Sequence, residues 1–206
     1  MTDPAEALRG GDVVILPTDT VYGLCAAAAA PEPVERLYAL KGRAAAQPSA
    51  LLAASLDTLL EWLPELEDGS AAIARELLPG PYTLVVPNPA RRYPWLTGTT
   101  PDALGIPVPV LPQAAARAVA AVGCVVATSA NLPGGPDPRR LEDVPRELVE
   151  RAAAAVDAGE LPGTPSTVLD VTGSEPRVIR EGAVPAAEAL ARLGDVRLGA
   201  EYHPGS

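Results

Sequence analysis

A short unbroken apolar run near the N-terminus limits what this chain can fold into. Residues 13–16 read VVIL and end at Pro17. A run this short, without alternation, is typical of a strand buried on both faces inside an α/β layer. Open α/β sheets bind ligands beyond the carboxyl ends of their strands. We therefore predict a ligand site in residues 18–23, which offer Thr18, Asp19, Thr20 and Tyr22. A plain strand-to-helix loop is the structural alternative.

Helix-like and strand-like segments alternate along the rest of the chain. The apolar spacing predicts helices at 31–43, 55–66, 70–80, 113–122, 146–156 and 185–194. Strands are predicted at 50–54, 82–86, 124–131, 166–171 and 177–182. Pro107 and Pro109 cannot donate to a ladder, so residues 103–112 are predicted to be an edge or a loop. The predicted fold class is α/β (α+β), with a twisted mixed sheet flanked by helices.

Lys41 is the only lysine among the 206 residues, and arginine supplies every other cationic side chain. A lysine kept against such a bias indicates a task that a guanidinium cannot perform. A compact ammonium suits a point contact to phosphate, whereas the planar fork of arginine is no free substitute. Lys41 and Arg43 also fall at the C-terminal end of the predicted helix 31–43, where cations suit the helix dipole. That structural explanation leaves the choice of lysine unexplained.

Composition excludes several classes of function. The net charge of −10 argues against direct nucleic-acid binding, because such binding depends on clustered cations. No apolar run approaches the length of a membrane span, and residues 1–12 show no signal-peptide pattern, so we expect a cytoplasmic protein. Cys25 and Cys124 are predicted to be buried thiols. The sole histidine, His203, leaves no His-based triad or His metal site.

Three further polar clusters resemble the first loop. They comprise Thr128, Ser129 and Asn131 after a buried strand; Thr164, Ser166 and Thr167 before another; and Arg180 close to Val178. Each alone is weak, because such residues usually make turns and caps. Together they supply hydroxyl and amide groups with cations and no strong general base. That inventory favours binding and electrostatic stabilisation of an anionic substrate.

These motifs resemble one family. PTDTVYGL, K-x-R after the next helix, SAN, and P-S-T-V-x-D followed by R-x-G occur here in the order found in the YrdC-like family of L-threonylcarbamoyladenylate synthases. The resemblance covers roughly residues 5–190 and implies the short form, with a single domain at 1–194 and a tail at 195–206. It implies a twisted mixed sheet of the YrdC/RibB type around a positively charged central cavity. The implied reaction combines L-threonine, bicarbonate and ATP, with Mg²⁺, into threonylcarbamoyl-AMP and pyrophosphate, for tRNA threonylcarbamoyladenosine formation with partner proteins of tRNA modification.

The resemblance also implies roles for individual residues. Lys41 and Arg43 would hold the ATP phosphates and act as the catalytic pair. Thr20 and Ser166, with Thr18 and Tyr22 beside them, would contact threonine. The nucleotide site would also include Ser129, Asn131 and Arg180. No protein metal ligands are predicted, although Asp19 and Asp170 would either orient the cations, bind Mg²⁺ or fix turns.

The chain departs from the family pattern at three places. Pro107 stands where the family usually has an arginine, Ala44 replaces a proline after K-x-R, and Pro133 replaces a serine after SAN. Losing one charge-assisted hydrogen bond costs about 1.5–3 kcal/mol, unless Arg91 or Arg92 compensates. The alternatives are therefore a paralogue that keeps the nucleotide pocket with lost or altered acceptor activity and, least favoured, an RNA-binding module.

Overall fold

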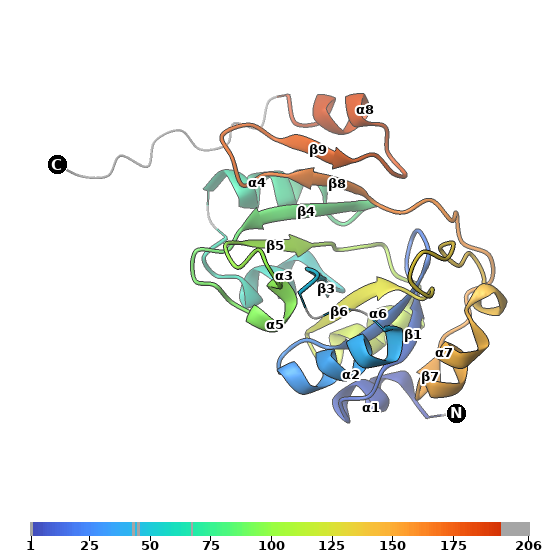
Figure 1. Ribbon diagram of the computed structural model, residues 1–206. Coiled ribbons are helices and arrows are strands. Elements are labelled where there is room, and N and C mark those ends of the chain that lie inside the picture. The colour runs from blue at the N-terminus through green and yellow to red at the C-terminus, as the bar shows by residue number, and fades with distance from the viewer. Residues whose placement is uncertain (1, 43, 45, 67, 195–206) are drawn as a thin grey trace.

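A nine-stranded mixed sheet organises the computed structural model, which describes residues 2–42, 44, 46–66 and 68–194. The strand order is β7-β1-β2-β6-β3-β5-β4-β8-β9 (Figure 1). Parallel pairs join β1 to β7, β3 to β5 and β4 to β8, and the other neighbours are antiparallel. The strands are β1 (Val14–Pro17), β2 (Tyr22–Ala27), β3 (Ala50–Ala53), β4 (Tyr82–Pro87), β5 (Ala103–Ile106), β6 (Cys124–Ser129), β7 (Ala154–Ala155), β8 (Thr167–Asp170) and β9 (Arg177–Arg180). The predicted mixed sheet is confirmed.

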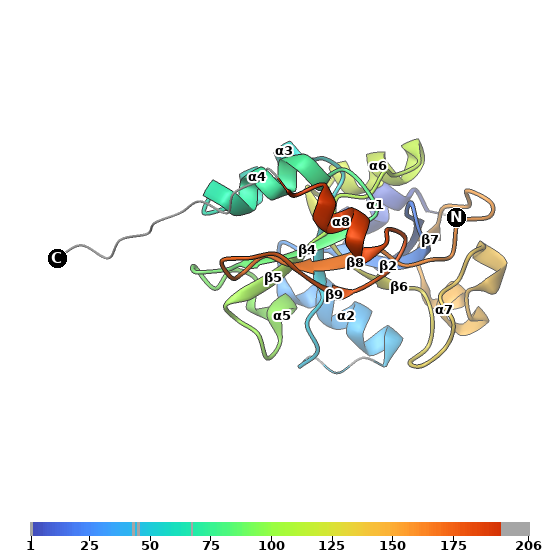
Figure 2. The same cartoon turned by 90° about the horizontal axis from the view of Figure 1, so that it is seen from above.

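Helices cover both faces of the sheet. In the view from above, α1, α3, α4 and α6 lie on one side, and α2 and α5 lie on the other (Figure 2). The helices are α1 (Pro4–Arg9), α2 (Pro31–Lys41), α3 (Leu56–Trp62), α4 (Asp68–Leu77), α5 (Pro94–Thr97), α6 (Gln113–Ala120), α7 (Arg146–Arg151) and α8 (Ala186–Ala191), with a 3₁₀ turn η1 at Leu141–Asp143. Across the described residues, no helix has the length and apolar character needed to cross a bilayer.

The strand β1 is buried on both faces, as the unbroken apolar run predicts. Ile15 packs into the larger core, and Val14 and Leu16 pack into the core formed with α1 and α6. All four residues of β1 are buried. Burial of both faces leaves only the end of the strand free to present polar groups.

The segment after Pro17 is a hairpin turn between two strands, so the alternative of a plain strand-to-helix loop is wrong. Chain direction reverses over residues 18–21, and β2 pairs antiparallel with β1 from Pro17↔Tyr22 to Val14↔Cys25. The sequence of β2, YGLCAA, is rich in small residues and has weak strand propensity. Pairing with β6 on its other side overrides that propensity.

Two other predicted segments differ from the structure. The helix predicted at 146–156 ends at Arg151, because residues 153–156 bond along β1: Ala153 N–H donates to Val13 O and Val156 N–H donates to Ile15 O. Within 103–112, residues 103–106 form the internal strand β5 rather than an edge. The strand ends before Pro107, so the two prolines lie outside the ladder.

Both cysteines are free and buried, which confirms that prediction. Cys25 packs into the core of α1 and α6, and Cys124 packs into the larger core. Burial raises the pKa of each thiol to about 12. Both thiols are therefore protonated at neutral pH and serve as small core residues.

Candidate active site

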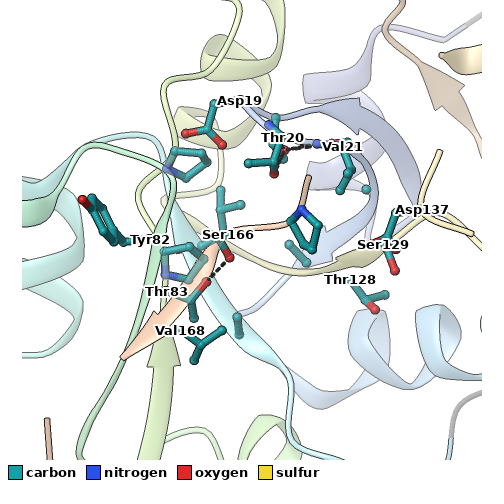
Figure 3. A pocket seen from close by; sticks show the side chains of 18 of the residues that line it. Asp19, Thr20, Val21, Tyr82, Thr83, Thr128, Ser129, Asp137, Ser166 and Val168 are labelled. Carbon is teal, nitrogen blue, oxygen red and sulfur yellow. Dashed lines mark hydrogen bonds between the residues drawn. The ribbon is translucent and has the colours of Figure 1, made fainter. Parts of the chain in front are cut away.

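A pocket of about 300 Å³ opens where the β1–β2 turn faces the starts of β4 and β8. Its walls are rich in hydroxyl groups, and Figure 3 shows Thr20 on one side, Ser166 with Thr83 on another, and Ser129 on a third. Prolines supply much of the remaining wall, namely Pro48, Pro107, Pro109 and Pro165. The pocket therefore combines rigid apolar walls with a few placed polar groups, as small-molecule sites do.

The β1–β2 turn presents the first pair of hydroxyls. Thr18 Oγ1 donates to Val21 O at 2.8 Å and accepts from the Thr20 and Val21 N–H groups. The two threonine hydroxyls lie 3.0 Å apart, and Thr20 is buried. Thr18 thus holds the turn while orienting Thr20, and both line the pocket.

Two glycines keep backbone close to the pocket. A Cβ at Gly23 would lie 3.3 Å from Thr128 O, and Gly23 itself lines the pocket opposite Ser129. A Cβ at Gly182 would lie 2.2 Å from Pro165 O, which no side chain can accommodate. The glycine of the R-x-G motif is therefore required for the segments of Pro165 and Arg180 to approach each other.

Lys41 is buried and engaged at the end of β6. Its Nζ donates to the Ser129 carbonyl oxygen, to Asn131 Oδ1 at 2.9 Å and to Ser129 Oγ at 3.4 Å. Ser129 Oγ donates to Asn131 Oδ1 at 2.7 Å. Lys41 and Asn131 line a second hollow of about 420 Å³, and Ser129 lines the first. The structure thus brings these three predicted residues together at the boundary of two hollows.

Arg180 lies on the opposite side of the first pocket. Its Nη2 donates to Ser166 O at 2.8 Å and to Ser166 Oγ at 3.3 Å. Ser166 Oγ also lies 2.8 Å from Thr83 Oγ1 (Figure 3). Thr83 was not predicted, because a threonine within an apolar strand fits ordinary strand propensity. Lys41 and Arg180 therefore line two different hollows.

Tyr22 does not reach the pocket, contrary to its predicted place beside threonine. Its hydroxyl donates to Gly159 O at 2.8 Å or to Asp157 at 3.1 Å, and accepts from Ala158 N–H. The reason is strand alternation: Gly23 faces the pocket, so Tyr22 faces the core. Arg43 lies outside the described residues.

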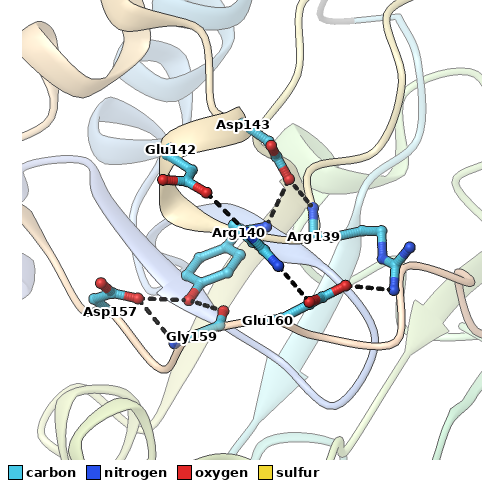
Figure 4. A network of polar contacts seen from close by, with 8 residues as sticks. Arg139, Arg140, Glu142, Asp143, Asp157, Gly159 and Glu160 are labelled. Carbon is cyan, nitrogen blue, oxygen red and sulfur yellow. Dashed lines mark hydrogen bonds and ion pairs between the residues drawn. The ribbon is translucent and has the colours of Figure 1, made fainter.

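A network of polar contacts fixes the loop at residues 157–160, which bonds to the Tyr22 hydroxyl (Figure 4). Glu160 forms ion pairs with Arg139 at 2.7 Å and with Arg140 at 2.6 Å. The Asp143 carboxylate accepts hydrogen bonds from the backbone N–H groups of the same two arginines. Hydrogen bonding to Arg140 lowers the pKa of the Glu160 carboxyl. These two arginines are therefore neutralised by carboxylates and do not add positive charge to the pocket.

The two predicted aspartates have different settings. Asp19 lines the pocket and accepts from Val110 N–H at 3.2 Å; burial raises the pKa of its carboxyl. Asp170 instead accepts from the Thr172 hydroxyl and N–H and pairs with Arg177, which lowers its pKa. Asp170 thus fixes the β8–β9 turn, as one of its predicted alternatives states.

Pro107 lines the pocket, so the departure from the family pattern falls in its wall. Neither arginine expected to compensate does so: Arg91 pairs with Asp102 at 2.8 Å, Arg92 pairs with Glu65, and neither lines the pocket. Within the described part of the chain, neither of these two arginines therefore brings positive charge to the wall at position 107.

Ser49 is a pocket residue that sequence reasoning missed. It is buried, and among the described residues its hydroxyl is the buried side-chain group without a hydrogen-bond partner. Nothing in the sequence distinguishes Ser49 as a pocket residue, because the segment Q-P-S-A resembles any turn that precedes a strand.

Fold and pocket define the class: a mixed α/β protein whose sheet carries a pocket lined by hydroxyls and bordered by two cations. The chain also matches, over residues 6–182, the family model Sua5/YciO/YrdC, described as "Telomere recombination". It therefore belongs to the Sua5/YciO/YrdC family, which confirms the resemblance found in the sequence.

Two relatives are about one-third identical in sequence to this chain. It is 31% identical over 195 residues to the threonylcarbamoyl-AMP synthase of Pyrococcus abyssi, covering 94% of this chain but 57% of that protein. It is 33% identical over 189 residues to a putative threonylcarbamoyl-AMP synthase of Mycobacterium tuberculosis, covering 91% and 86%. The chain thus spans little more than half the length of the archaeal relative.

Solved structures agree with the fold. The crystal structure of Pyrococcus abyssi Sua5 complexed with L-threonine superposes with a TM-score of 0.78 at 30% identity, covering 94% of this chain and 57% of that one. Escherichia coli YciO superposes with a TM-score of 0.75 at 23% identity over 90% of each chain, which supports the fold alone.

Proposed function

We propose that this chain joins L-threonine, bicarbonate and ATP into threonylcarbamoyl-AMP, with release of pyrophosphate, as the first step of tRNA threonylcarbamoyladenosine formation. The observation that carries this proposal is the meeting of Thr20, Ser166, Arg180 and Ser129 around one pocket, with Lys41 bonded to Ser129. Family membership supports the same reaction.

The residues divide into two sets by position. Thr20, held by Thr18, and Ser166 would contact threonine in the first pocket. Lys41 and Asn131, in the adjoining hollow, would hold ATP phosphates together with Arg43. Ser129 at the boundary and Arg180 on the far wall would complete the nucleotide site.

The chemistry needs placement and charge more than a protein nucleophile. The threonine nitrogen would bond to the carbon of bicarbonate with loss of water, which gives a carbamate. A carbamate oxygen would then bond to the α-phosphorus as the bond from that phosphorus to the bridging oxygen breaks, and pyrophosphate would leave. Cations stabilise the charge that accumulates on phosphate oxygens in such a displacement. Lys41, from the adjoining hollow, and Arg180, from the first pocket, would supply this positive charge.

The pocket suits Mg²⁺ that arrives with ATP. Mg²⁺ usually takes one or two carboxylates together with substrate phosphates, and Asp19 and Asp137 line the pocket. Among the described residues, no group of three histidine, cysteine or acidic side chains could hold a metal alone. When bound, Mg²⁺ would neutralise phosphate charge.

The test is product detection with omission controls. Protein incubated with ATP, L-threonine, bicarbonate and Mg²⁺ should yield threonylcarbamoyl-AMP by mass spectrometry, and leaving out any one substrate should abolish it. The uncharged wall at Pro107 favours one second candidate, a paralogue that binds ATP without threonine-dependent turnover. Saturable ATP binding by calorimetry with no adduct under any condition would decide for the paralogue.

A further inference from the structure

Thr83, Ser166 and Arg180 meet at one corner of the pocket because of strand register. Thr83 of β4 pairs with Val168 of β8, and Val168 pairs with Arg180 of β9. Thr83, Val168 and Arg180 therefore form one row across the three adjacent strands, and all three line the pocket. Ser166 immediately precedes β8 and reaches both ends of the row, Thr83 at 2.8 Å and Arg180 at 3.3 Å.

The donors and acceptors of this corner can be counted. The Arg180 guanidinium can only donate, so Ser166 Oγ accepts from it. One of the two hydroxyls, Thr83 or Ser166, must donate to the other. The pair therefore has one hydroxyl proton left over for a third partner.

An anionic oxygen would fix the direction of this chain of hydrogen bonds. Such an oxygen only accepts, so with Ser166 donating to it, Thr83 must donate to Ser166. Arg180 adds a charge: among the residues that the structure describes, no carboxylate forms an ion pair with it. The corner thus offers an oriented hydroxyl proton beside a guanidinium, which is an arrangement suited to carboxylate or phosphate.

We propose that Thr83 is a positioning residue, which orients the Ser166 hydroxyl beside Arg180 so that this corner binds an anionic oxygen of a substrate. The proposal rests on the proposed function for the identity of the substrates. The oxygen would belong either to the carboxylate of the amino acid or to a phosphate of the nucleotide.

The experiment is a double-mutant cycle with two ligands. Calorimetry measures the affinity of L-threonine and of ATP, each alone, for wild type, T83V, S166A and the double variant. T83S restores the hydroxyl as a rescue. T58V is the matched control, because Thr58 also pairs with a serine hydroxyl, Ser55 at 2.9 Å, on helix α3 away from the pocket.

Because Thr83 acts through Ser166, T83V should lower the affinity for one of the two ligands about three- to tenfold when Ser166 is present. The same substitution should lower that affinity less than twofold when it is combined with S166A. T83S and T58V should bind like wild type. If T83V loses affinity for L-threonine, the oxygen bound at this corner belongs to a carboxylate; if it loses affinity for ATP, the oxygen belongs to a phosphate. Either result supports the proposal. The proposal is overturned if T83V loses the same affinity with and without S166A, or if T83V loses no affinity. It is also overturned if T58V loses as much affinity as T83V, or if the wild type binds neither ligand. A wild type that binds ligand but forms no adduct contradicts the proposed function and leaves the corner standing.

Discussion

At the scale of single residues, Lys41 shows why one ammonium is kept in an arginine-rich chain. Its Nζ donates to oxygens of two described residues, namely the Ser129 carbonyl, Ser129 Oγ and Asn131 Oδ1. An ammonium donates three hydrogens in directions that rotate to suit, whereas a guanidinium is planar and larger. Only 6% of Lys41 is exposed, so a wider head group would displace its neighbours.

Ser49 allows a stability test at the same scale. Because its buried hydroxyl has no partner among the described residues, S49A should raise the free energy of unfolding, by about 1 kcal/mol. The contrasting variant is T167V. Thr167 Oγ1 donates to Val184 O and accepts from the N–H groups of Gly182 and Val184, so T167V should lower stability by about 1–3 kcal/mol. Denaturant unfolding of both variants checks this; a loss in S49A equal to that in T167V would contradict it.

At the scale of elements, the β8–β9 hairpin depends on the ionised Asp170. Hydrogen bonds from Thr172, with Arg177 beside them, lower the pKa of this carboxyl in the folded state. A lowered folded pKa contributes stability that is present above the ordinary value of 3.8 and is lost as pH falls through the folded value. D170N should therefore unfold at a lower temperature than wild type at pH 7, and the two melting temperatures should converge as pH falls below 3.8. A difference that stays constant down to acid pH would be the contrary result.

The segment after β5 is the second element that permits a test. Pro107 and Pro109 both line the pocket, but the family pattern has arginine only at the position of Pro107. P107R should therefore tighten ATP binding about tenfold or more, by adding a charge-assisted hydrogen bond, while P109R should not. Calorimetry with ATP measures both. Unchanged affinity in P107R would show that this wall does not limit the site.

At the scale of the whole molecule, local pattern predicted most elements, and pairing between distant segments decided the rest. The apolar runs of β1 and β6 were strong signals, whereas β2 was missed because YGLCAA is small and lacks alternation. The run of four alanines at 152–155 favours a helix locally, yet the backbone of residues 153–156 bonds to β1. Strand partners far along the chain are not visible in local periodicity.

The site followed the same division. Of the residues that the motif resemblance singled out, Thr20, Ser166 and Arg180 line one pocket, and Lys41 bonds to Ser129 and Asn131. It misplaced Tyr22, because the side to which a strand residue points depends on register. It missed Thr83 and Ser49, because their significance comes from neighbours in space.

Over the whole molecule negative charge prevails, and the positive charge of the candidate site is local. The chain carries −10 overall, and arginines such as Arg139 and Arg140 are paired with carboxylates. Among the described residues, Arg180 brings positive charge to the pocket and Lys41 brings it to the adjoining hollow, which argues for a small anionic ligand over a nucleic-acid backbone.

The central claim is that Lys41 holds the phosphates of an ATP that reacts with threonine. The direct measurement is pyrophosphate release from ATP with L-threonine and bicarbonate present or omitted, for wild type and K41R side by side. We predict release by wild type only when all three substrates are present, and a fall of about tenfold to a hundredfold in K41R, because the wider, planar guanidinium cannot take the buried place of the Lys41 ammonium and its charge-assisted contact to phosphate is misaligned. Release that does not depend on threonine, or a K41R variant as active as wild type, would contradict the account.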